Sequence, residues 1–408
     1  MSSEIEIKTI LNNSTIDVKF QPIISIARKS IIGLDGISLG AKIDNEFLPI
    51  EKLFETAKKE DSLIDLDRSI REQIVEAFNK ISGSSDKLLF ISVDMAVIEK
   101  HVGSGIIIDL VNRFNIDPKN VVLEIFENNI TDEEALKQFI NSYRSKGFLV
   151  ALAIGSGFAN LDKISHVEPD IIKISEAITK DIAEDFYKQE IFKSLINLSK
   201  KISAMVIADG INLEEQAILA MELGADMLQG NFFGGYSTIT RSLLKKIEDF
   251  STQFATRYRK YKKEQIDFEK SRHLQYKKIL DDIIYGLSSI NELDFDVKLD
   301  KVVEKYDGFE CVYVLDSEGK QVTDTATHLK HIFSQKSLIF KPAKKGTDHS
   351  LKKYYYLLND MGLDKYVTDP YVSSASGNLC ITISEKFKAA DKKDYIICID
   401  FNPSHLNL

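Results

Sequence analysis

Short runs of apolar, β-branched residues alternate with longer segments of helical periodicity between residues 17 and 235. This alternation predicts parallel strands covered by helices. Eight such runs within roughly 220 residues approach the strand count and size of a (β/α)8 barrel, which typically needs about 250 residues. The eight predicted strands are DVKFQPII, SIIGLDGI, LLFISVDM, VVLEIFE, FLVALAI, DIIKIS, AMVIADGI and ADMLQGNFF.

The pattern changes twice after the predicted barrel. From Arg241 to Leu287 apolar residues recur every three or four positions, without proline and with one late glycine, Gly286, which predicts a long amphipathic helix. Either a second helix or the chain's own domains could bury its apolar stripe. Beyond residue 290, the runs CVYVLD, YVTDPYVS, LCITIS and YIICID predict an antiparallel sheet. We therefore divide the chain into residues 1–240, 241–289 and 290–408.

Composition narrows the function classes. The chain has 408 residues, more than one hydrophobic core usually serves. Its net charge of −9 opposes the attraction to phosphate that dominates nucleic-acid binding, so we expect no nucleic-acid partner. The three cysteines stand in apolar runs, which favours buried free thiols over disulfides. No targeting segment or apolar run of about 18 residues occurs, so we expect a cytoplasmic protein without a membrane span.

Polar residues close nearly every predicted barrel strand. Because the functional face of a parallel barrel lies at the carboxyl ends of its strands, these side chains should converge on one mouth. Convergent carboxylates suit hard divalent cations, which can activate water against a phosphodiester. An internal pair between a lysine and a carboxylate, with solvated loop ends, explains the spacing equally simply. The residues concerned are Gln21, Asp35, Asp94, Glu124 with Glu127, Lys173, Asp209 and Gln229.

One strand departs from this pattern. The run FLVALAIGSG places Leu152 and Ala153 where an acidic pair would complete a two-metal site. Neither side chain has an oxygen that could bind a metal ion. The sequence therefore predicts a mouth with several carboxylates but an incomplete metal site.

Residues 16 to 237 resemble the EAL-domain phosphodiesterases, which hydrolyse cyclic di-GMP. FQPIIS is similar to the opening QPI strand of that family, and VVLEIFE, DIIKIS and VIADGI are similar to its LEITE, IKID and AEGVE strands. MLQGNFFG is similar to its closing QGY motif. The resemblance implies an α/β fold with an EAL-type (β/α)8-like barrel.

Several family positions are altered here. The EAL signature reads Asp35-Gly36-Ile37, and Leu39 replaces the family's phosphate-gripping arginine. Asp94 corresponds to the metal-binding asparagine, and Leu152 and Ala153 correspond to the paired aspartates of the DDFG motif. The resemblance thus implies a degenerate site without an intact catalytic set. The family's metal and catalytic positions are Asp35, Asp94, Glu124, Leu152, Ala153, Lys173, Asp209 and Gln229.

Ligand binding is separable from hydrolysis, because shape and phosphate contacts can hold a nucleotide without a metal. We expect no metal cofactor. If a residual site works, Glu124 and Asp94 would hold Mg²⁺ or Mn²⁺. Leu39 and the surplus of carboxylates count against binding a dianion. The candidate cyclic di-GMP-binding residues are Gln21, Asp35, Leu39, Asp94, Glu124, Lys173, Asp209, Gln229 and Gly230.

The segments VYVLDSEGKQVTD and YVTDPYVSSASGNLCITIS resemble small-molecule sensor domains of the PAS-like and Cache class. This resemblance implies an α+β domain with a pocket on its sheet for an unidentified effector. Candidate lining residues are Tyr354, Asp369, Tyr371 and Ser373, although each could equally be an ordinary turn or core residue. The order of barrel, long helix and sensor module resembles the YkuI-type architecture of EAL proteins, which implies a homodimer.

Three hypotheses follow for function. The first is a catalytically inactive EAL protein that couples its C-terminal sensor to a protein partner through the barrel, with cyclic di-GMP as a candidate ligand. The second is a residual metal-dependent phosphodiesterase that uses Asp35, Asp94, Glu124 and Asp209. The third is a dimeric scaffold that binds no nucleotide.

Overall fold

The computed structural model describes residues 15–43, 46–94, 105–126, 132–155, 161–306, 309–327 and 340–402. The chain forms two compact units, Met1–Lys263 and Glu264–Leu408. The boundary falls inside the long helix α11 (Arg241–Ser288), which confirms the predicted helix and contributes residues to both units. No helix among the described residues is long and apolar enough to cross a membrane.

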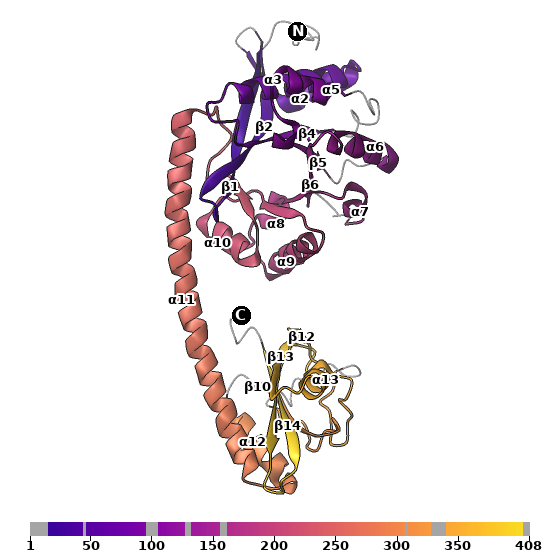
Figure 1. Cartoon of the computed structure of the whole chain (residues 1–408), viewed down its shortest axis with the longest axis vertical. Coiled ribbons are helices and arrows are strands. Elements are labelled where there is room, and N and C mark those ends of the chain that lie inside the picture. Colours follow the sequence, from indigo (N-terminus) through magenta and orange to yellow (C-terminus); the bar gives the residue numbers. More distant parts are fainter. Residues whose placement is uncertain are drawn as a thin grey trace. The chain divides into compact units, whose positions relative to one another are not determined.

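Eight strands of the first unit close into a barrel (Figure 1). All eight predicted runs contribute, and the pairing of β1 with β2 completes the ring. A ninth strand, β3 (Glu46–Pro49), extends β2 as a hairpin outside the ring. The order around the ring is β1 (Thr15–Ser25), β9 (Met227–Gln229), β8 (Met205–Ala208), β7 (Ile171–Ile174), β6 (Leu149–Ile154), β5 (Val121–Phe126), β4 (Leu88–Val93) and β2 (Ser30–Ile43).

The expectation of an entirely parallel barrel is wrong for β1. This strand runs antiparallel to both of its neighbours, β2 and β9, whereas the other ring neighbours pair in parallel. The cause is the short turn at residues 26–29, which joins β1 to β2. A parallel connection needs a crossover of a dozen or more residues, so a tight turn can only produce an antiparallel pair.

Helices cover the outside of the barrel, because each buries an apolar stripe against the ring. In α6 (Glu133–Arg144), for example, the buried residues Leu136, Phe139, Ile140 and Tyr143 recur at three- and four-residue spacing. The other helices of this layer are α2 (Ile50–Lys59), α3 (Leu63–Asn79), α5 (Ile106–Arg113), α7 (Lys163–Val167), α8 (Glu176–Thr179), α9 (Phe186–Lys201) and α10 (Glu214–Leu223), with the 3-10 turn η1 (Pro118–Asn120).

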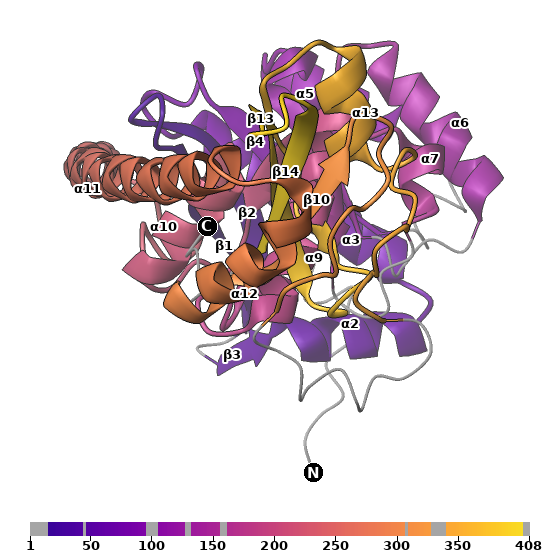
Figure 2. The same ribbon diagram turned by 90° about the horizontal axis from the view of Figure 1, so that it is seen from below.

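The second unit contains the predicted antiparallel sheet. Its strand order is β10 (Phe309–Asp316), β14 (Asp394–Phe401), β13 (Leu379–Lys388) and β11 (Lys365–Val367), and β12 (Tyr371–Val372) also pairs with β13. In Figure 2, α12 (Phe295–Lys305) lies on one side of this sheet and α13 (Lys353–Asp360) on the other. The 3-10 turn η3 (Glu292–Asp294) precedes α12.

Alternation along β10 explains how the sheet buries both faces. Val312 and Val314 belong to the core that includes the end of α11 and α12, whereas Tyr313 and Leu315 pack with the tyrosines of α13. Successive strand residues point to opposite faces, so one strand supplies both cores. All three cysteines, Cys311, Cys380 and Cys398, are free and buried, as predicted.

Candidate functional site

Lys173 lies at the centre of the barrel mouth. Its Nζ is 2.8 Å from Asp35 Oδ2 and 2.9 Å from Glu124 Oε1, and it is 4.0 Å from Asp209 Oδ2. Lys173, Asp35 and Glu124 are all buried. The simpler of the two sequence-based interpretations, an internal pair between a lysine and carboxylates, therefore describes this mouth.

Two glutamines join the network, Gln21 from β1 next to Asp35 and Gln229 from β9 on the far side of β1. Gln229 Nε2 donates to Asp35 Oδ2 at 2.8 Å and to Gln21 Oε1 at 3.0 Å. The antiparallel register sets Gln21 directly opposite Asp35. Asp35 itself lies inside the 14-residue strand β2 and not at its end, contrary to the sequence-based placement. The β1–β2 hairpin, together with strand β9, positions these three side chains.

Burial and charge act in opposite directions within this cluster. Burial raises the pKa of Glu124 to about 7, and the nearby charge of Asp35 adds to the rise although Lys173 opposes it. Burial alone would lower the pKa of Lys173, but its carboxylate neighbours raise that pKa well above the ordinary value. Lys173 thus stays protonated, and Glu124 keeps its proton to a higher pH than an ordinary glutamate. Burial also raises the pKa of Asp209.

Three oxygens of the network are buried and have no hydrogen-bond partner among the described atoms. They are Asp35 Oδ1, Glu124 Oε1 and Gln229 Oε1. Glu124 Oε1 is near enough to Lys173 for an ion pair, but the geometry of the contact is not that of a hydrogen bond. The mouth therefore retains acceptor capacity for a ligand or solvent donor.

The two residues at the family's paired-aspartate position face opposite sides of β6. Leu152 belongs to the core between the barrel and its helices, together with Ile125 and Ile172 of the adjacent strands. Ala151 belongs to the barrel interior, and alternation places Ala153 on that same side. Ala153 pairs with Lys173 of β7. Only Ala153 is thus directed toward the mouth.

Four other predicted site residues, Asp209, Gly230, Leu39 and Asp94, are also among the described residues. Asp209 follows β8, and its Oδ1 accepts the backbone N–H of Gly210 at 2.7 Å. Gly230 has φ +148°, and a Cβ there would lie 2.1 Å from the carbonyl oxygen of Ile211, so a larger residue does not fit. Leu39 is 37% exposed, and Asp94 follows β4 with intermediate exposure.

Sequence reasoning missed two residues near the mouth. Tyr236 lies close enough to Asp35 and Lys173 for their charges to act on it, and burial together with Asp35 raises its pKa. Ser175 follows β7, and its Oγ is buried without a described partner. Ser175 is the last residue of the predicted run DIIKIS, and Tyr236 stands three residues beyond the run ADMLQGNFF, so inspecting every polar residue at and just past the strand ends would have found both.

The described residues of the mouth, which do not include Glu127, do not fit a two-metal site. Among the residues that the structure describes, three carboxylate or histidine ligand atoms come within 4.8 Å of one another only at Glu133, Asp162 and His166, on α6 and around α7. At the mouth, Lys173 already supplies a positive charge to Asp35 and Glu124. Ala153 adds no ligand atom on the strand between Glu124 and Lys173.

The C-terminal sheet has a small polar cavity of about 60 Å³. Three of the four predicted sensor residues, Tyr354, Tyr371 and Ser373, line it, whereas Asp369 is exposed and does not. Sequence reasoning missed His349 and Asp400, which also line the cavity. His349 Nδ1 lies 2.7 Å from the Tyr354 hydroxyl, and burial lowers the pKa of His349 to about 4. Burial raises the pKa of Asp400 to about 7.

Known proteins resemble this chain over two different spans. The sequence model of the EAL domain matches residues 5–236. The probable cyclic di-GMP phosphodiesterase PdeA of Escherichia coli is 26% identical over 232 residues, which cover 56% of this chain and 31% of PdeA. The chain spans between about a third and a half of the length of the three probable E. coli phosphodiesterases PdeA, PdeB and PdeG, at 31%, 42% and 48%.

A second similarity covers most of the chain. The EAL-domain protein YkuI of Bacillus subtilis, which is itself uncharacterised, is 25% identical over 382 residues, 90% of each chain. The crystal structure of YkuI in complex with substrate c-di-GMP and calcium superposes with a TM-score of 0.76 at 22% identity and covers 98% of this chain and 99% of YkuI. The likeness to YkuI over nearly the whole chain shows the fold. The PAS-like or Cache identity of the C-terminal unit and the homodimer stay predictions.

Proposed function

The chain belongs to the EAL-domain family, and on that premise we propose that it is a catalytically inactive member that acts in cyclic di-GMP signalling. The observation that carries this proposal is the chemistry of β6, which supplies Leu152 and Ala153 at the position of the family's aspartate pair. Two divalent ions would activate a water molecule there, and this strand offers no oxygen side chain to hold them. Lys173 neutralises two of the remaining carboxylates instead.

The decisive experiment is hydrolysis of cyclic di-GMP by the full chain with Mg²⁺ or Mn²⁺. We expect no turnover above a protein-free blank, because the nucleophilic hydroxide is not generated. Turnover that Glu124→Gln abolishes would establish the residual phosphodiesterase and overturn the proposal. An intact EAL phosphodiesterase assayed in parallel shows that the substrate and ions are competent.

Cyclic di-GMP remains the candidate ligand of the barrel. The oxygens of Asp35, Glu124 and Gln229 that have no hydrogen-bond partner among the described atoms could accept hydrogen bonds from a bound molecule, and YkuI has been crystallised with c-di-GMP. The exposed Leu39 and the excess of carboxylates oppose a dianion. Calorimetric titration with and without Mg²⁺ separates the receptor from the scaffold, since a scaffold produces no binding heat at high micromolar ligand.

We assign the input of this signalling protein to the C-terminal unit and its output to a protein partner of the barrel. Support comes from the polar cavity that Tyr354, Tyr371 and Ser373 line, and from the YkuI-like order of the domains. An effector that binds one conformational state better than another would shift the equilibrium between them. X-ray scattering of the proposed homodimer with a metabolite panel tests this coupling, and indifference to every metabolite contradicts it.

A further inference from the structure

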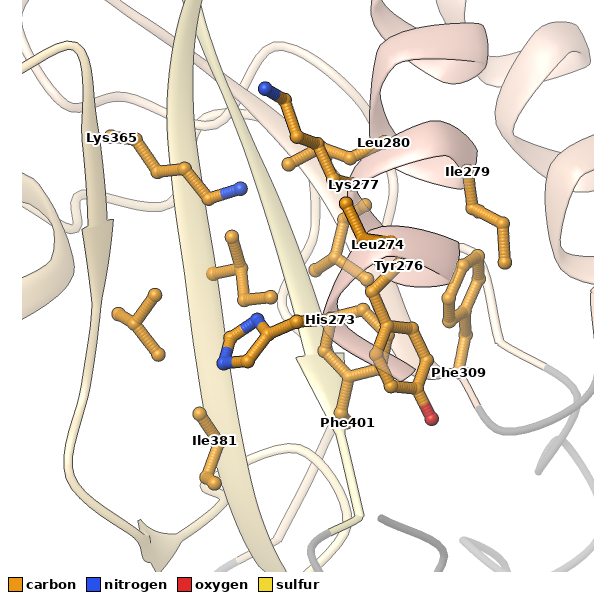
Figure 3. Close-up of a pocket in the computed structure, with 13 residues that line it drawn as sticks. His273, Leu274, Tyr276, Lys277, Ile279, Leu280, Phe309, Lys365, Ile381 and Phe401 are labelled. Atoms are coloured by element: carbon orange, nitrogen blue, oxygen red, sulfur yellow. The ribbon is translucent and has the colours of Figure 1, made fainter. Parts of the chain in front are cut away.

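A second cavity, of about 370 Å³, lies entirely within the second unit. It is enclosed by the C-terminal part of α11 and by the sheet strands β10, β11, β13 and β14 (Figure 3). The polar cavity contains Tyr313 and Tyr354, which pack on the α13 side of the sheet, whereas this one contains residues of the α11 side. The two cavities therefore occupy opposite faces of one sheet.

The walls of this cavity are apolar. The sheet contributes Ile381, Ile399, Phe309 and Phe401, and each exposes no more than 7% of its surface. Helix α11 contributes Tyr276, Ile279 and Leu280 opposite the sheet. Its volume falls within the range of about 300–1,000 Å³ that is usual for small-molecule sites. The interior thus favours a hydrocarbon body of modest size over a polar molecule.

The charged groups that line the cavity are basic. They are Lys277 from α11 and Lys365 from β11, while His273 and the Tyr276 hydroxyl are further polar groups, and no carboxylate among the described residues lines the cavity. In Figure 3, the His273 ring lies over the sheet and the side chain of Lys365 extends from its strand toward the helix. Glu385 approaches Lys365 to 3.5 Å, but it does not line the cavity. An anionic head group is therefore complementary to these residues, and a cationic one is not.

We propose that this cavity binds an amphiphilic monoanion, with its alkyl body between α11 and the sheet and its carboxylate near Lys277 and Lys365. A hydrocarbon chain gains free energy from burial against Ile381, Ile399 and Phe401. Two ammonium groups and the His273 ring provide donors for the head group. The site is separate from the barrel and does not depend on the function proposed for it.

An alkyl chain fits the space better than a helix from a second copy of the chain. An α-helix with its side chains is about 10–12 Å across and needs a wide, open groove. Here the deep part of the sheet wall is buried, since Ile399 exposes 0% and Phe401 5% of their surfaces, and only its edge at Val367 is open, with 47% exposed. Leu274, by contrast, is 70% exposed at the edge of the cavity and offers a position where charge can be changed without disturbing the core.

Titration calorimetry of the full chain with dodecanoate, below its micelle concentration, tests the proposal. We expect saturable binding of one molecule per chain, at least tenfold tighter than that of dodecyltrimethylammonium, which has the same body and the opposite charge. Lys277→Glu combined with Lys365→Glu should weaken dodecanoate binding by at least tenfold, because both favourable charges become repulsive.

Matched variants at one exposed position sharpen the test. Leu274→Asp should weaken dodecanoate binding several-fold and Leu274→Lys should not, whereas Val372→Asp, an equivalent change at a residue outside the cavity that is 57% exposed, should have no effect. Equal affinity for the two amphiphiles, or equal effects of the two Leu274 variants, would overturn the proposal. So would binding to phosphatidylglycerol vesicles but not to free dodecanoate. A dimer that Leu274→Asp dissociates, without dodecanoate binding, would assign the cavity to a second copy instead.

Discussion

Two lysine–aspartate pairs of this protein have almost the same length and opposite surroundings. Lys173 and Asp35 lie 2.8 Å apart in the barrel mouth, with 6% and 3% of their side chains exposed. Lys388 and Asp394 lie 2.9 Å apart on the β13–β14 hairpin, with 66% of each side chain exposed. The distance between the charged atoms therefore does not by itself predict how much free energy is lost when one partner is removed. Burial of the pair does, because water can replace the lost partner only at the surface.

The comparison also explains why the buried carboxylates of the barrel mouth have partners. The barrel buries Asp35 and Glu124, whose charges need compensation. Lys173 and Gln229 provide it from two other strands. The network can thus hold the mouth together without metal ions.

The largest expected effect comes from placing a carboxylate on either side of β6. Leu152→Asp buries a charge among the apolar helix-facing residues of the core and should cost more than about 4 kcal/mol of unfolding free energy. Ala153→Asp faces the mouth beside Lys173 and should cost far less. Urea unfolding followed by circular dichroism measures both. Equal losses would show that the two side chains do not face opposite sides.

Removing the buried cation should have the next largest effect. Lys173→Met leaves Asp35 and Glu124 uncompensated and should destabilise the barrel by about 3–5 kcal/mol. Adding Asp35→Asn should recover part of the loss. Peptide-resolved hydrogen–deuterium exchange assigns the change to β7 and its neighbours rather than to the C-terminal unit. Unchanged protection of β7 in Lys173→Met would refute a structural role for the pair.

Stability should also depend on pH through Glu124. Its pKa is about 7 in the folded barrel and 4.5 in its ordinary state, so the folded protein holds this proton more tightly. The contribution is complete below pH 4.5 and disappears as the pH rises through 7, which lowers the unfolding free energy by about 3 kcal/mol. Asp400 and Asp67, with pKa values of about 7 and 6, act in the same direction. Glu124→Gln should flatten the pH profile by the Glu124 share alone, and an unchanged slope would contradict this assignment.

The smallest effect on the unfolding free energy is expected from the exposed pair of Lys388 and Asp394, which serves as the control for the buried pair. Lys388→Ala should change the unfolding free energy by no more than about 1 kcal/mol, because both charges stay hydrated after the change. Added salt should reduce even this difference, whereas it should leave the effect of Lys173→Met nearly intact. The unfolding free energies of both variants, measured in low and in high salt, test this difference. An equal response of Lys388→Ala and Lys173→Met to salt would contradict it.

Much of the site was predictable because its signals are local. Polar residues within or directly after apolar runs identified Asp35, Glu124, Lys173 and Gln229, and the structure brings these four together. The placement of Asp35 at a strand end was wrong, since β2 continues to Ile43. Asp369 shares a sequence segment with Tyr371 but is exposed, outside the polar cavity. Nearness in sequence does not fix on which side of a strand or turn a side chain lies.

The helices and strands could be predicted from the sequence, because the spacing of apolar residues follows the geometry of the segment in which they lie. The sequence determined the eight barrel strands, the long helix and the antiparallel sheet. Four features follow from tertiary packing alone. They are the direction of β1, the outward orientation of Leu152, the cavity between α11 and the sheet, and the contact between Gln229 and Asp35 across 194 residues. These features depend on strand register and on closure of the ring, which bring together segments far apart in the sequence. The local pattern of one segment does not predict which other segment it will contact.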